Sequence, residues 1–255
     1  MKNLFDISGK VAIVTGGSRG IGEMIAQGFV EAGAKVYITA RKAEACDATA
    51  ARLSELGTCI SLPFDLSSVE GVTAFAKEIA SREEKLDILV NNAGAAWGEP
   101  LDQYSEKGWD KVFDINLKGP FFLTQQLLPL LRKAATHEAP ARIINTASIN
   151  GINPPILETY AYSSSKAGMI MLTRHLAGQL AKQNILVNAI APGPFPSNMM
   201  AATLAEMGDA IKASNPRGRI GEPEDIAGVA IFLASRASAY TTGACIPCDG
   251  GDSQV

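Results

Sequence analysis

Two side chains that can carry a proton lie four residues apart in the segment Tyr162-Ser163-Ser164-Ser165-Lys166. If this segment opens a helix, the phenol and the ammonium share one helix face. A phenol has a pKa of about 10, and a nearby ammonium favours the phenolate and lowers that pKa toward neutral pH. We therefore expect Tyr162 to act as an acid or base. An ordinary helix start with capping serines is the structural alternative.

A hydroxyl beside this pair comes from Ser148, which follows a run at 142–147 that is typical of a buried strand. A serine there could bind a carbonyl oxygen next to Tyr162, which predicts ketone reduction or alcohol oxidation and requires a hydride source. Tyr160 is an alternative tyrosine, but Ser164 rather than a lysine follows it four residues later. Tyr162 is therefore the better candidate.

A glycine-rich segment stands between the β-branched run 10–15 and an amphipathic pattern that ends at Gly33. In a strand–turn–helix context, glycines let the backbone approach a pyrophosphate, and the helix N-terminus offers unpaired N–H groups. A glycine turn without a ligand is the alternative. We expect a dinucleotide to contact Gly16, Ser18, Arg19, Gly20, Ile21 and Gly22.

The next predicted strand, 35–39, ends without the acidic residue that holds the ribose 2′-hydroxyl of NAD in many dinucleotide folds. Ala40 occupies the place and Arg41 follows it. Arg41 and Arg19 together suit a 2′-phosphate, because each guanidinium can make charge-assisted, bidentate hydrogen bonds. The sequence thus favours NADPH over NADH, with solvent-facing arginines as the alternative.

Other predicted strand ends add cofactor contacts. Asp65, after a strand at 59–64, is placed to accept from an adenine amino group or to cap a helix beginning near Ser67. The small residues after the strand 87–90 let the backbone lie against a cofactor. The strand 184–190 ends in a proline-rich turn that cannot continue the sheet. The remaining contacts assigned to the cofactor are Leu66, Asn92, Ala93, Gly94, Tyr162, Lys166, Pro192, Gly193 and Ser197.

Asn116 lies between predicted helices at 103–112 and 118–134, in an apolar stretch where its amide needs partners. It could bond the backbone and hold a water that passes protons to Lys166, or be a purely structural amide. Helices are also expected at 43–56, 199–213 and 223–234, and a last strand at 243–248. The apolar helix 199–213 is the natural lid.

Size and composition narrow the class of protein. The 255 residues are 47% hydrophobic with 24 glycines, and β–α alternation without a linker predicts one domain over residues 1–255. Dispersed basic residues and a net charge of −3 argue against nucleic acid as a partner. No run is long enough to span a membrane and no apolar leader opens the chain, so we expect a soluble cytoplasmic protein.

No metal site is expected. Cys245 and Cys248 have the spacing of a redox or zinc pair, but no second pair accompanies them, and in a strand residues three apart point to opposite faces. Structural packing is the favoured interpretation. His137 and His175 are far apart in sequence and lack a carboxylate cluster.

From Lys10 to Gly251 the chain resembles the classical short-chain dehydrogenase/reductases. The resemblance rests on several motifs in the expected order: Thr15 to Gly22, Asn91-Asn92-Ala93-Gly94, Asn116, Ser148, Tyr162 with Lys166, Pro192-Gly193 and Asp249-Gly250-Gly251. It implies an α/β, Rossmann-type three-layer sandwich with a seven-stranded parallel sheet in the order 3-2-1-4-5-6-7. It also implies a homotetramer, assembled through helices near 118–134 and 162–182.

The resemblance further implies a catalytic tetrad of Asn116, Ser148, Tyr162 and Lys166. Ser148 and Tyr162 would bond the substrate oxygen, and Tyr162 would donate its proton as hydride arrives from the nicotinamide. Lys166 would lower the pKa of the tyrosine and bond the nicotinamide ribose, and Asn116 would hold the water relay. The spacing from Ser148 to Tyr162 is longer than is common in the family, which places a substrate-facing loop at 152–159.

Within the family, the amino-acid sequence most resembles the 3-oxoacyl-[acyl-carrier-protein] reductases of the branch associated with rhamnolipid synthesis. This implies NADPH-dependent reduction of a 3-oxoacyl thioester in fatty acid metabolism, linked to acyl carrier protein or CoA. The alternatives are an NADP-linked dehydrogenase of a sugar, steroid or other alcohol, and a non-catalytic NADPH-sensing protein. An apolar lid would fit an acyl chain: Phe195, Met199, Met200, Leu204 and Met207. A carrier protein would need a basic patch, for which the candidates are Arg132, Lys133, Arg174 and Lys182.

Overall fold

The computed structural model describes residues 3–254. Its seven described strands form one all-parallel sheet in the order β3-β2-β1-β4-β5-β6-β7, which confirms the predicted fold class and strand order. The strands are β1 (Val11–Thr15), β2 (Lys35–Thr39), β3 (Cys59–Ser61), β4 (Ile88–Asn91), β5 (Ala141–Thr146), β6 (Ile185–Pro192) and β7 (Cys245–Cys248).

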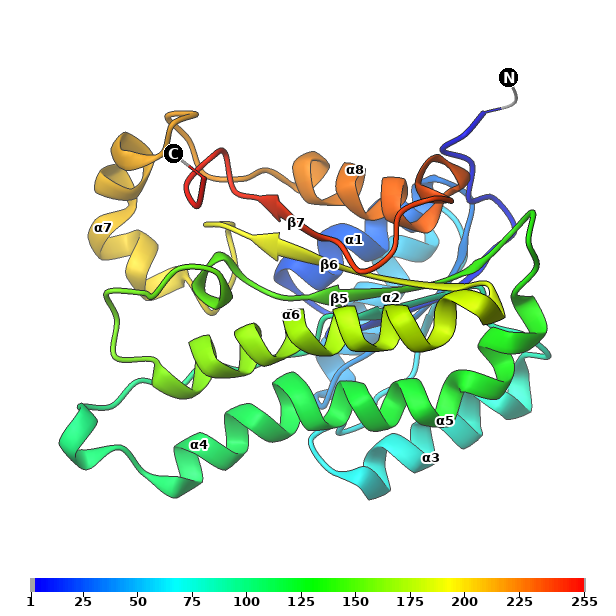
Figure 1. Cartoon of the computed structure of the whole chain (residues 1–255), viewed down its shortest axis with the longest axis horizontal. Helices are drawn as coiled ribbons and strands as arrows, with labels where there is room; N and C mark the ends of the chain where they lie inside the picture. Colours follow the sequence, from blue (N-terminus) through cyan, green and yellow to red (C-terminus); the bar gives the residue numbers. More distant parts are fainter. Residues whose placement is uncertain (1–2, 255) are drawn as a thin grey trace.

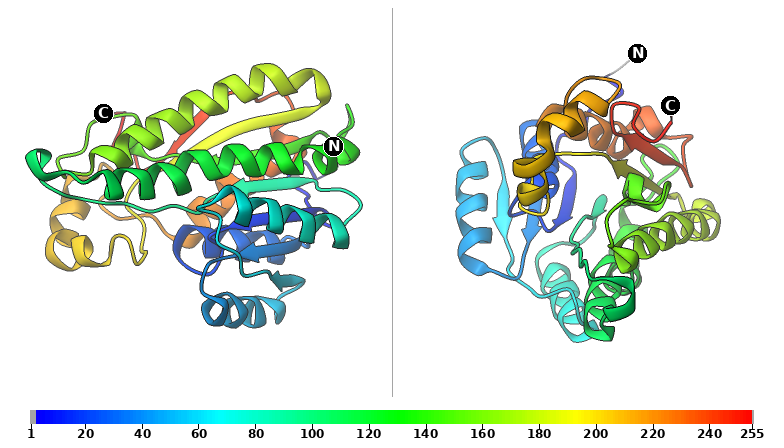
Figure 2. Two further views of the ribbon diagram at one scale, coloured as in Figure 1. Left: turned by 90° about the horizontal axis from the view of Figure 1, so that it is seen from below. Right: turned by 90° about the vertical axis from the view of Figure 1, so that its left-hand side faces the viewer.

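Helices cover both faces of the sheet, in three layers (Figures 1 and 2). One face carries α1 (Gly20–Glu31), α2 (Ala43–Ser54) and α8 (Pro223–Ala234). The other carries α3 (Val69–Arg82), α4 (Glu106–Phe113), α5 (Gly119–Ala134) and α6 (Tyr160–Leu180). A further helix, α7 (Ala201–Ser214), follows the loop after β6 and buries none of its residues.

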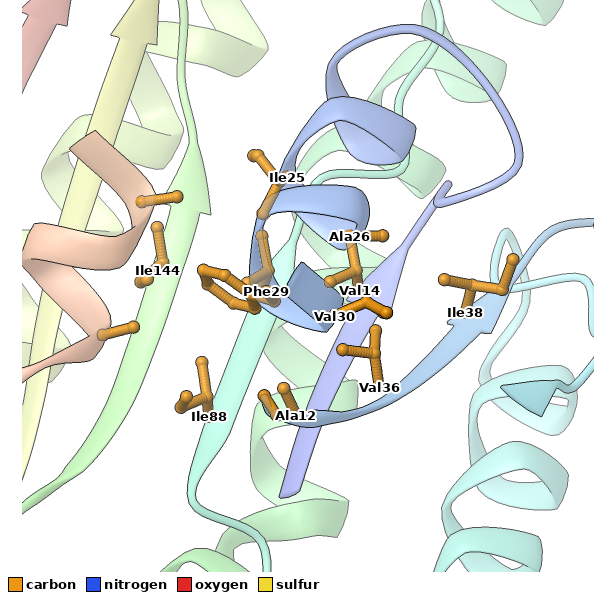
Figure 3. Packing of buried hydrophobic residues seen from close by; sticks show 14 of the residues in the cluster. Ala12, Val14, Ile25, Ala26, Phe29, Val30, Val36, Ile38, Ile88 and Ile144 are labelled. Atoms are coloured by element: carbon orange, nitrogen blue, oxygen red, sulfur yellow. The ribbon is translucent and has the colours of Figure 1, made fainter. Parts of the chain in front are cut away.

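Side chains of the central strand β1 point alternately into two hydrophobic clusters, one on each face of the sheet. Ala12 and Val14 of β1 face the cluster that α1 and α8 cover, whereas Ile13 joins the opposite cluster. Figure 3 shows Ile25 and Phe29 of α1 packed in the first cluster. Because a parallel sheet is buried on both faces, its strands are almost continuously apolar, and this is the signal that made them predictable.

Several predicted boundaries were wrong. The strand β3 ends at Ser61 rather than Phe64, and β6 continues to Pro192, which pairs with Cys248. A proline can end this strand because the next residue supplies the donor: Gly193 N–H bonds the Cys248 carbonyl at 3.0 Å. The two helices predicted around Asn116 form one continuous helical path, joined by a π-helical turn at Asp114–Lys118.

The described residues hold no group of three or more His, Cys, Asp or Glu side chains arranged for a metal ion. Cys245 and Cys248 are free thiols that pack against different clusters, in agreement with the expected opposite faces. Within residues 3–254, every helix is too short or too polar to cross a membrane.

Candidate active site

The predicted site residues follow the carboxyl ends of the strands and therefore meet at one edge of the sheet. The strand order reverses between β1 and β4, and a crevice for a dinucleotide forms at such a switch point. The glycine loop after β1 and the Asn-Asn-Ala-Gly turn after β4 lie against each other there. A Cβ on Gly16 would lie 2.9 Å from Ala93 Cα, and Asn92 Nδ2 donates to the Thr15 carbonyl at 2.9 Å.

The glycine loop has no room for side chains at its two tightest positions. A Cβ on Gly22 would collide with Asn92 Nδ2 and the Gly16 carbonyl, and one on Gly17 would lie 2.6 Å from Ile38 Cγ2. Gly16 and Gly20 have φ values of 66° and 56°, a left-handed conformation that favours glycine. This loop leads directly into the N-terminus of α1, whose N-cap Arg19 gives no side-chain cap. The cradle thus leaves backbone N–H groups for a phosphate.

The two arginines predicted to read a 2′-phosphate flank this cradle. Arg19 and Arg41 are exposed, and neither side chain bonds or pairs with another residue of the described chain. Thr39, just before Ala40, keeps a buried Oγ1 without a hydrogen-bond partner. That hydroxyl is buried, so the groups available to a ligand beside β2 are the two exposed arginines, which fit a phosphorylated ribose.

Asp65 does not cap α3, so that alternative was wrong. Ser68 is the N-cap, and its Oγ accepts from Gly71 N at 3.1 Å. Asp65 Oδ1 instead accepts from the Ser67 N–H and hydroxyl, at 3.0 and 2.7 Å. An adenine contact to its other oxygen stays a prediction. Leu66 places its side chain in the core, so only its main chain is available to a cofactor.

Tyr162 and Lys166, the predicted catalytic pair, lie where the Ser148 segment contacts α6. Ser148 is buried and caps a 3-10 turn, and a Cβ on Gly151 in that turn would lie 2.6 Å from the Lys166 carbonyl carbon. Tyr162 and Lys166 lie four residues apart on one face of α6, with Lys166 Nζ 5.7 Å from the centre of the Tyr162 ring. Lys166 Nζ donates to the Thr146 carbonyl at 2.7 Å.

Burial dominates the electrostatics of this pair. It lowers the pKa of Lys166 to about 8. It raises the pKa of Tyr162 above its ordinary value, although a hydrogen bond with Ser148 acts in the opposite direction. The sequence predicted a lowered pKa for Tyr162. In the structure the pKa is raised, because removal of the phenolate from water outweighs the polar neighbours.

Asn116 is buried at the centre of the π-helical turn, and its amide is largely satisfied. Its Oδ1 accepts from Ala95 N at 2.8 Å, and its Nδ2 donates to the Ala95 carbonyl and the Ser165 hydroxyl, each at 3.0 Å. Because both amide hydrogens are used, Asn116 can serve a relay water only as an acceptor. A Cβ on Gly94 would lie 3.0 Å from Asn116 Oδ1 and 3.7 Å from Lys166 Nζ, so these three residues converge.

The loop after β6 completes the site above the glycine loop. A Cβ on Gly20 would lie 3.0 Å from Ser197 Cβ, which brings Ser197 to the cofactor cradle. Pro192 ends β6 at the same edge, and Gly193 follows it. Phe195, predicted to line the lid, is only 2% exposed and packs in the core, where Gly221 leaves space for its ring. Met199 and Met207 remain exposed, as a lid requires.

The basic residues proposed for the pocket mouth lie elsewhere. Arg132 and Lys133 close α5 just before β5, and Lys182 immediately precedes β6. These positions are at the amino ends of the strands, on the sheet edge opposite Ser148 and Tyr162. Arg174 is two turns beyond Lys166 along α6, toward that same edge. A docking surface built on these four residues at the mouth was therefore wrong.

The sequence analysis did not identify three residues whose hydrogen bonds fix the position of site residues. The Thr15 hydroxyl accepts from both Asn92 N and Ala93 N at 2.9 Å and fixes the turn after β4. Thr146 provides the carbonyl that orients Lys166, and Ser165 binds Asn116. Thr15 and Ser165 belong to recognised motifs and were within reach of the sequence. The Thr146 contact could not be predicted, because every residue type has a main-chain carbonyl.

Comparisons with known proteins agree with this geometry. A family model described as "Enoyl-(Acyl carrier protein) reductase" matches residues 16–253. The Pseudomonas aeruginosa protein named "Rhamnolipids biosynthesis 3-oxoacyl-[acyl-carrier-protein] reductase" is 51% identical over 253 residues, which cover 98% of this chain and 99% of the relative. The 2-dehydro-3-deoxy-D-gluconate 5-dehydrogenase of Dickeya dadantii is 37% identical over 256 residues, covering 98% and 97%.

Among solved structures, the "Pseudomonas aeruginosa RhlG/NADP active-site complex" superposes with a TM-score of 0.95 at 50% identity, covering 99% of this chain and 100% of that one. On its fold, its site and these relatives, the chain belongs to the short-chain dehydrogenase/reductase family.

Proposed function

We propose that the protein is an NADPH-dependent carbonyl reductase that acts on 3-oxoacyl thioesters. The observation that carries the proposal is the convergence of Ser148, Tyr162, Lys166 and Asn116 beside a glycine cradle, in a chain 51% identical to a 3-oxoacyl reductase. The cofactor is NADP(H), as in the P. aeruginosa complex. Its pyrophosphate would lie on the glycine loop and its 2′-phosphate between Arg19 and Arg41.

The residues of this chain divide the chemistry between them. When bound, NADPH supplies the hydride. Ser148 and Tyr162 hydrogen-bond the substrate carbonyl oxygen, and Tyr162 transfers its proton to that oxygen as negative charge develops. Burial raises the pKa of Tyr162, which makes the phenol a weaker proton donor, so the proton transfer needs a nearby positive charge. Lys166, held by Thr146, places its ammonium beside the tyrosine ring and stabilises the phenolate that remains.

After the reaction Tyr162 must regain its proton, and the buried polar groups next to Lys166 offer a route for it. Lys166 Nζ and Asn116 Oδ1 both lie near Gly94, and Asn116 accepts there but has no hydrogen left to donate. A water held between them would return a proton to Tyr162 through Lys166. This is the role proposed for Asn116.

The lid favours an apolar substrate over a sugar. The exposed side chains Met199 and Met207 stand on or beside α7, and Ile156 and Leu157 are exposed on the loop before α6. Burying such side chains against an acyl chain is favourable, whereas sugar hydroxyls would need polar partners. An NADP-linked sugar dehydrogenase is the second candidate, because a D. dadantii relative carries such a name. A non-catalytic NADPH sensor is disfavoured because the tetrad is intact.

The remaining parts of the proposal concern the whole chain. We propose a single dinucleotide-binding and catalytic domain over residues 1–255, located in the cytoplasm. We also propose a homotetramer, supported by exposed apolar side chains on the two helices expected at subunit contacts: Phe121 on α5 and Met171 on α6, the latter 60% exposed. Light scattering that shows only monomer would exclude the tetramer. Acyl carrier protein is a proposed partner on the strength of the relative's name alone.

The deciding experiment follows NADPH oxidation with acetoacetyl-CoA and with a longer 3-oxoacyl carrier-protein substrate, and repeats both with NADH. Turnover of a thioester with preference for NADPH supports the proposal, and the better carrier identifies the thioester source. A parallel assay offers NADP⁺ with 2-dehydro-3-deoxy-D-gluconate. Turnover in that assay alone would establish the sugar dehydrogenase instead.

A further inference from the structure

The residues after β7 form a compact turn around one carboxylate, which we call the C-terminal turn (residues 249–254). Asp249 Oδ1 accepts from Gly251 N at 2.9 Å, and its Oδ2 accepts from the Ser253 N–H and hydroxyl at 2.9 and 2.6 Å. Gly250 and Gly251 adopt φ values of 69° and 96°. Three donors on one carboxylate, with two left-handed glycines, fix the path of the turn.

The C-terminal turn contacts the end of α7. Asn215, which follows α7 and is 6% exposed, donates from Nδ2 to the Asp249 carbonyl at 2.8 Å. Its Oδ1 accepts from Arg217 N at 2.9 Å and leaves no space for a Cβ on Gly250. Because α7 buries none of its own residues, this polar contact is a principal anchor of its C-terminal end.

The same turn contacts two further segments, the loop before α6 and the end of β6. Asn153 Nδ2, in the loop between Ser148 and Tyr162, donates to the Ser253 carbonyl at 3.3 Å. At the end of β6, a Cβ on Gly193 would lie 2.7 Å from Asp249 Cβ. Figure 1 shows the red C-terminal segment beside α7. Three segments that are far apart in sequence, and that the proposed function places around the substrate, therefore meet on one turn.

We propose that Asp249 is a positioning residue for substrate binding: through the C-terminal turn it holds α7 and the loop 152–159 in register with the end of β6. The segments it joins expose most of their side chains, so apolar packing does little to fix them. Ile156, for example, is fully exposed on that loop.

The carboxylate itself is required for this role. Burial acts to raise the pKa of Asp249, but the hydrogen bonds from Ser253 and Gly251 outweigh it, and the pKa lies below its ordinary value. Asp249 is thus ionised at neutral pH. In Asp249→Asn, an amide NH₂ would replace one acceptor and face the N–H of Gly251 or the donors of Ser253. The turn would lose at least one charge-assisted bond.

The test compares Asp249→Asn with Asp252→Asn, an exposed carboxylate in the same turn whose side chain makes no hydrogen bond within residues 3–254. The rate of amide hydrogen exchange is measured for each peptide of the NADPH-bound protein by mass spectrometry. In Asp249→Asn we expect exchange at 199–214 and 152–159 to rise about tenfold, with β1 and α1 unchanged. The KM for acetoacetyl-CoA should rise about tenfold, with the NADPH dissociation constant within about twofold of the parent.

Unchanged exchange in both segments, or an increase spread over the whole chain, would overturn the proposal. The inference uses the proposed function only for its substrate. If the parent enzyme turns over no thioester, the proposed function fails and the exchange result still decides the role of Asp249. Should Asp249→Asn not fold, Ser253→Ala removes a single donor to Oδ2, and the same localised increase in exchange is expected.

Discussion

The side-chain Nζ of Lys166 donates to the main-chain oxygen of Thr146 across 2.7 Å, at the last residue of β5. This bond joins helix α6 to the sheet at the carboxyl edge where the cofactor site lies. The Thr146 hydroxyl lies 3.4 Å from Asn92 Oδ1, in the turn after β4. The position of the Lys166 ammonium is therefore coupled to the end of β5 and, through it, to the cofactor crevice.

Lys166→Met should abolish turnover and change the pH dependence of stability. Burial lowers the pKa of Lys166 to about 8, while an unfolded lysine titrates near 10.4. The unfolded chain binds more protons between these values, so stability of the parent rises with pH across this window. The methionine variant lacks this rise. Its stability relative to the parent should be highest below pH 8 and fall by up to about 3 kcal/mol toward pH 10.

Urea unfolding at several pH values between 7 and 10 measures this difference. Lys182→Met, at an exposed lysine, is the matched control and should show no such pH trend. A constant stability difference between Lys166→Met and the parent would contradict the assigned burial of the charge.

Tyr162→Phe should reduce kcat at least about 100-fold, because it removes the proton donor to the substrate oxygen. NADPH binding, followed by cofactor fluorescence, should change little. Tyr160→Phe is the control, since the Tyr160 hydroxyl bonds Glu158 at 3.3 Å and its ring contacts Tyr104. Retained turnover in Tyr162→Phe would refute the assigned acid.

Arg41→Ala should raise the NADPH dissociation constant much more than that for NADH, by about tenfold or more for one lost charge-assisted contact. The reason is that only NADPH carries the 2′-phosphate. Titration of both cofactors measures the difference, with Lys42→Ala as the neighbouring exposed cation. An equal effect on both cofactors would remove Arg41 from the phosphate site.

The fold was predictable because its signals are local and repeated. Five β-branched or apolar runs predicted strands that are buried on both faces, and the glycine loop after the first run fixed the nucleotide crevice. The strand order itself came from the resemblance of the motifs to a known family. Ser148, Tyr162 and Lys166 were first argued from the chemistry and spacing of their residue types, and the resemblance joined them with Asn116 as a tetrad. The structure brings all four to one edge.

The errors arose where residue type does not specify location. Phe195 is apolar and lies in a loop, which fits a lid and a core equally well, and only the space above Gly221 decides for the core. Arg132 and Lys133 end a helix antiparallel to the strands, so topology rather than charge places them away from the mouth. Asn116 in the π-helical turn bonds Ala95 and Ser165, which lie 21 and 49 residues away in sequence, so these partners could not be identified from the sequence.

A last prediction tests the glycine cradle apart from the chemistry. In Gly22→Ala the new methyl would collide with Asn92 Nδ2 and the Gly16 carbonyl, which join the loops after β1 and β4. Since main-chain atoms cannot move aside without opening the crevice, we expect a loss of NADPH affinity of at least about tenfold and a destabilisation of about 1–3 kcal/mol.

Gly178→Ala is the matched control: it lies within α6, where an added Cβ meets nothing within 4 Å, and should be neutral or stabilise by up to about 1 kcal/mol. Calorimetric titration with NADPH and thermal unfolding measure both effects. Unimpaired NADPH binding by Gly22→Ala would mean that the close packing of these two loops is not what shapes the pyrophosphate site.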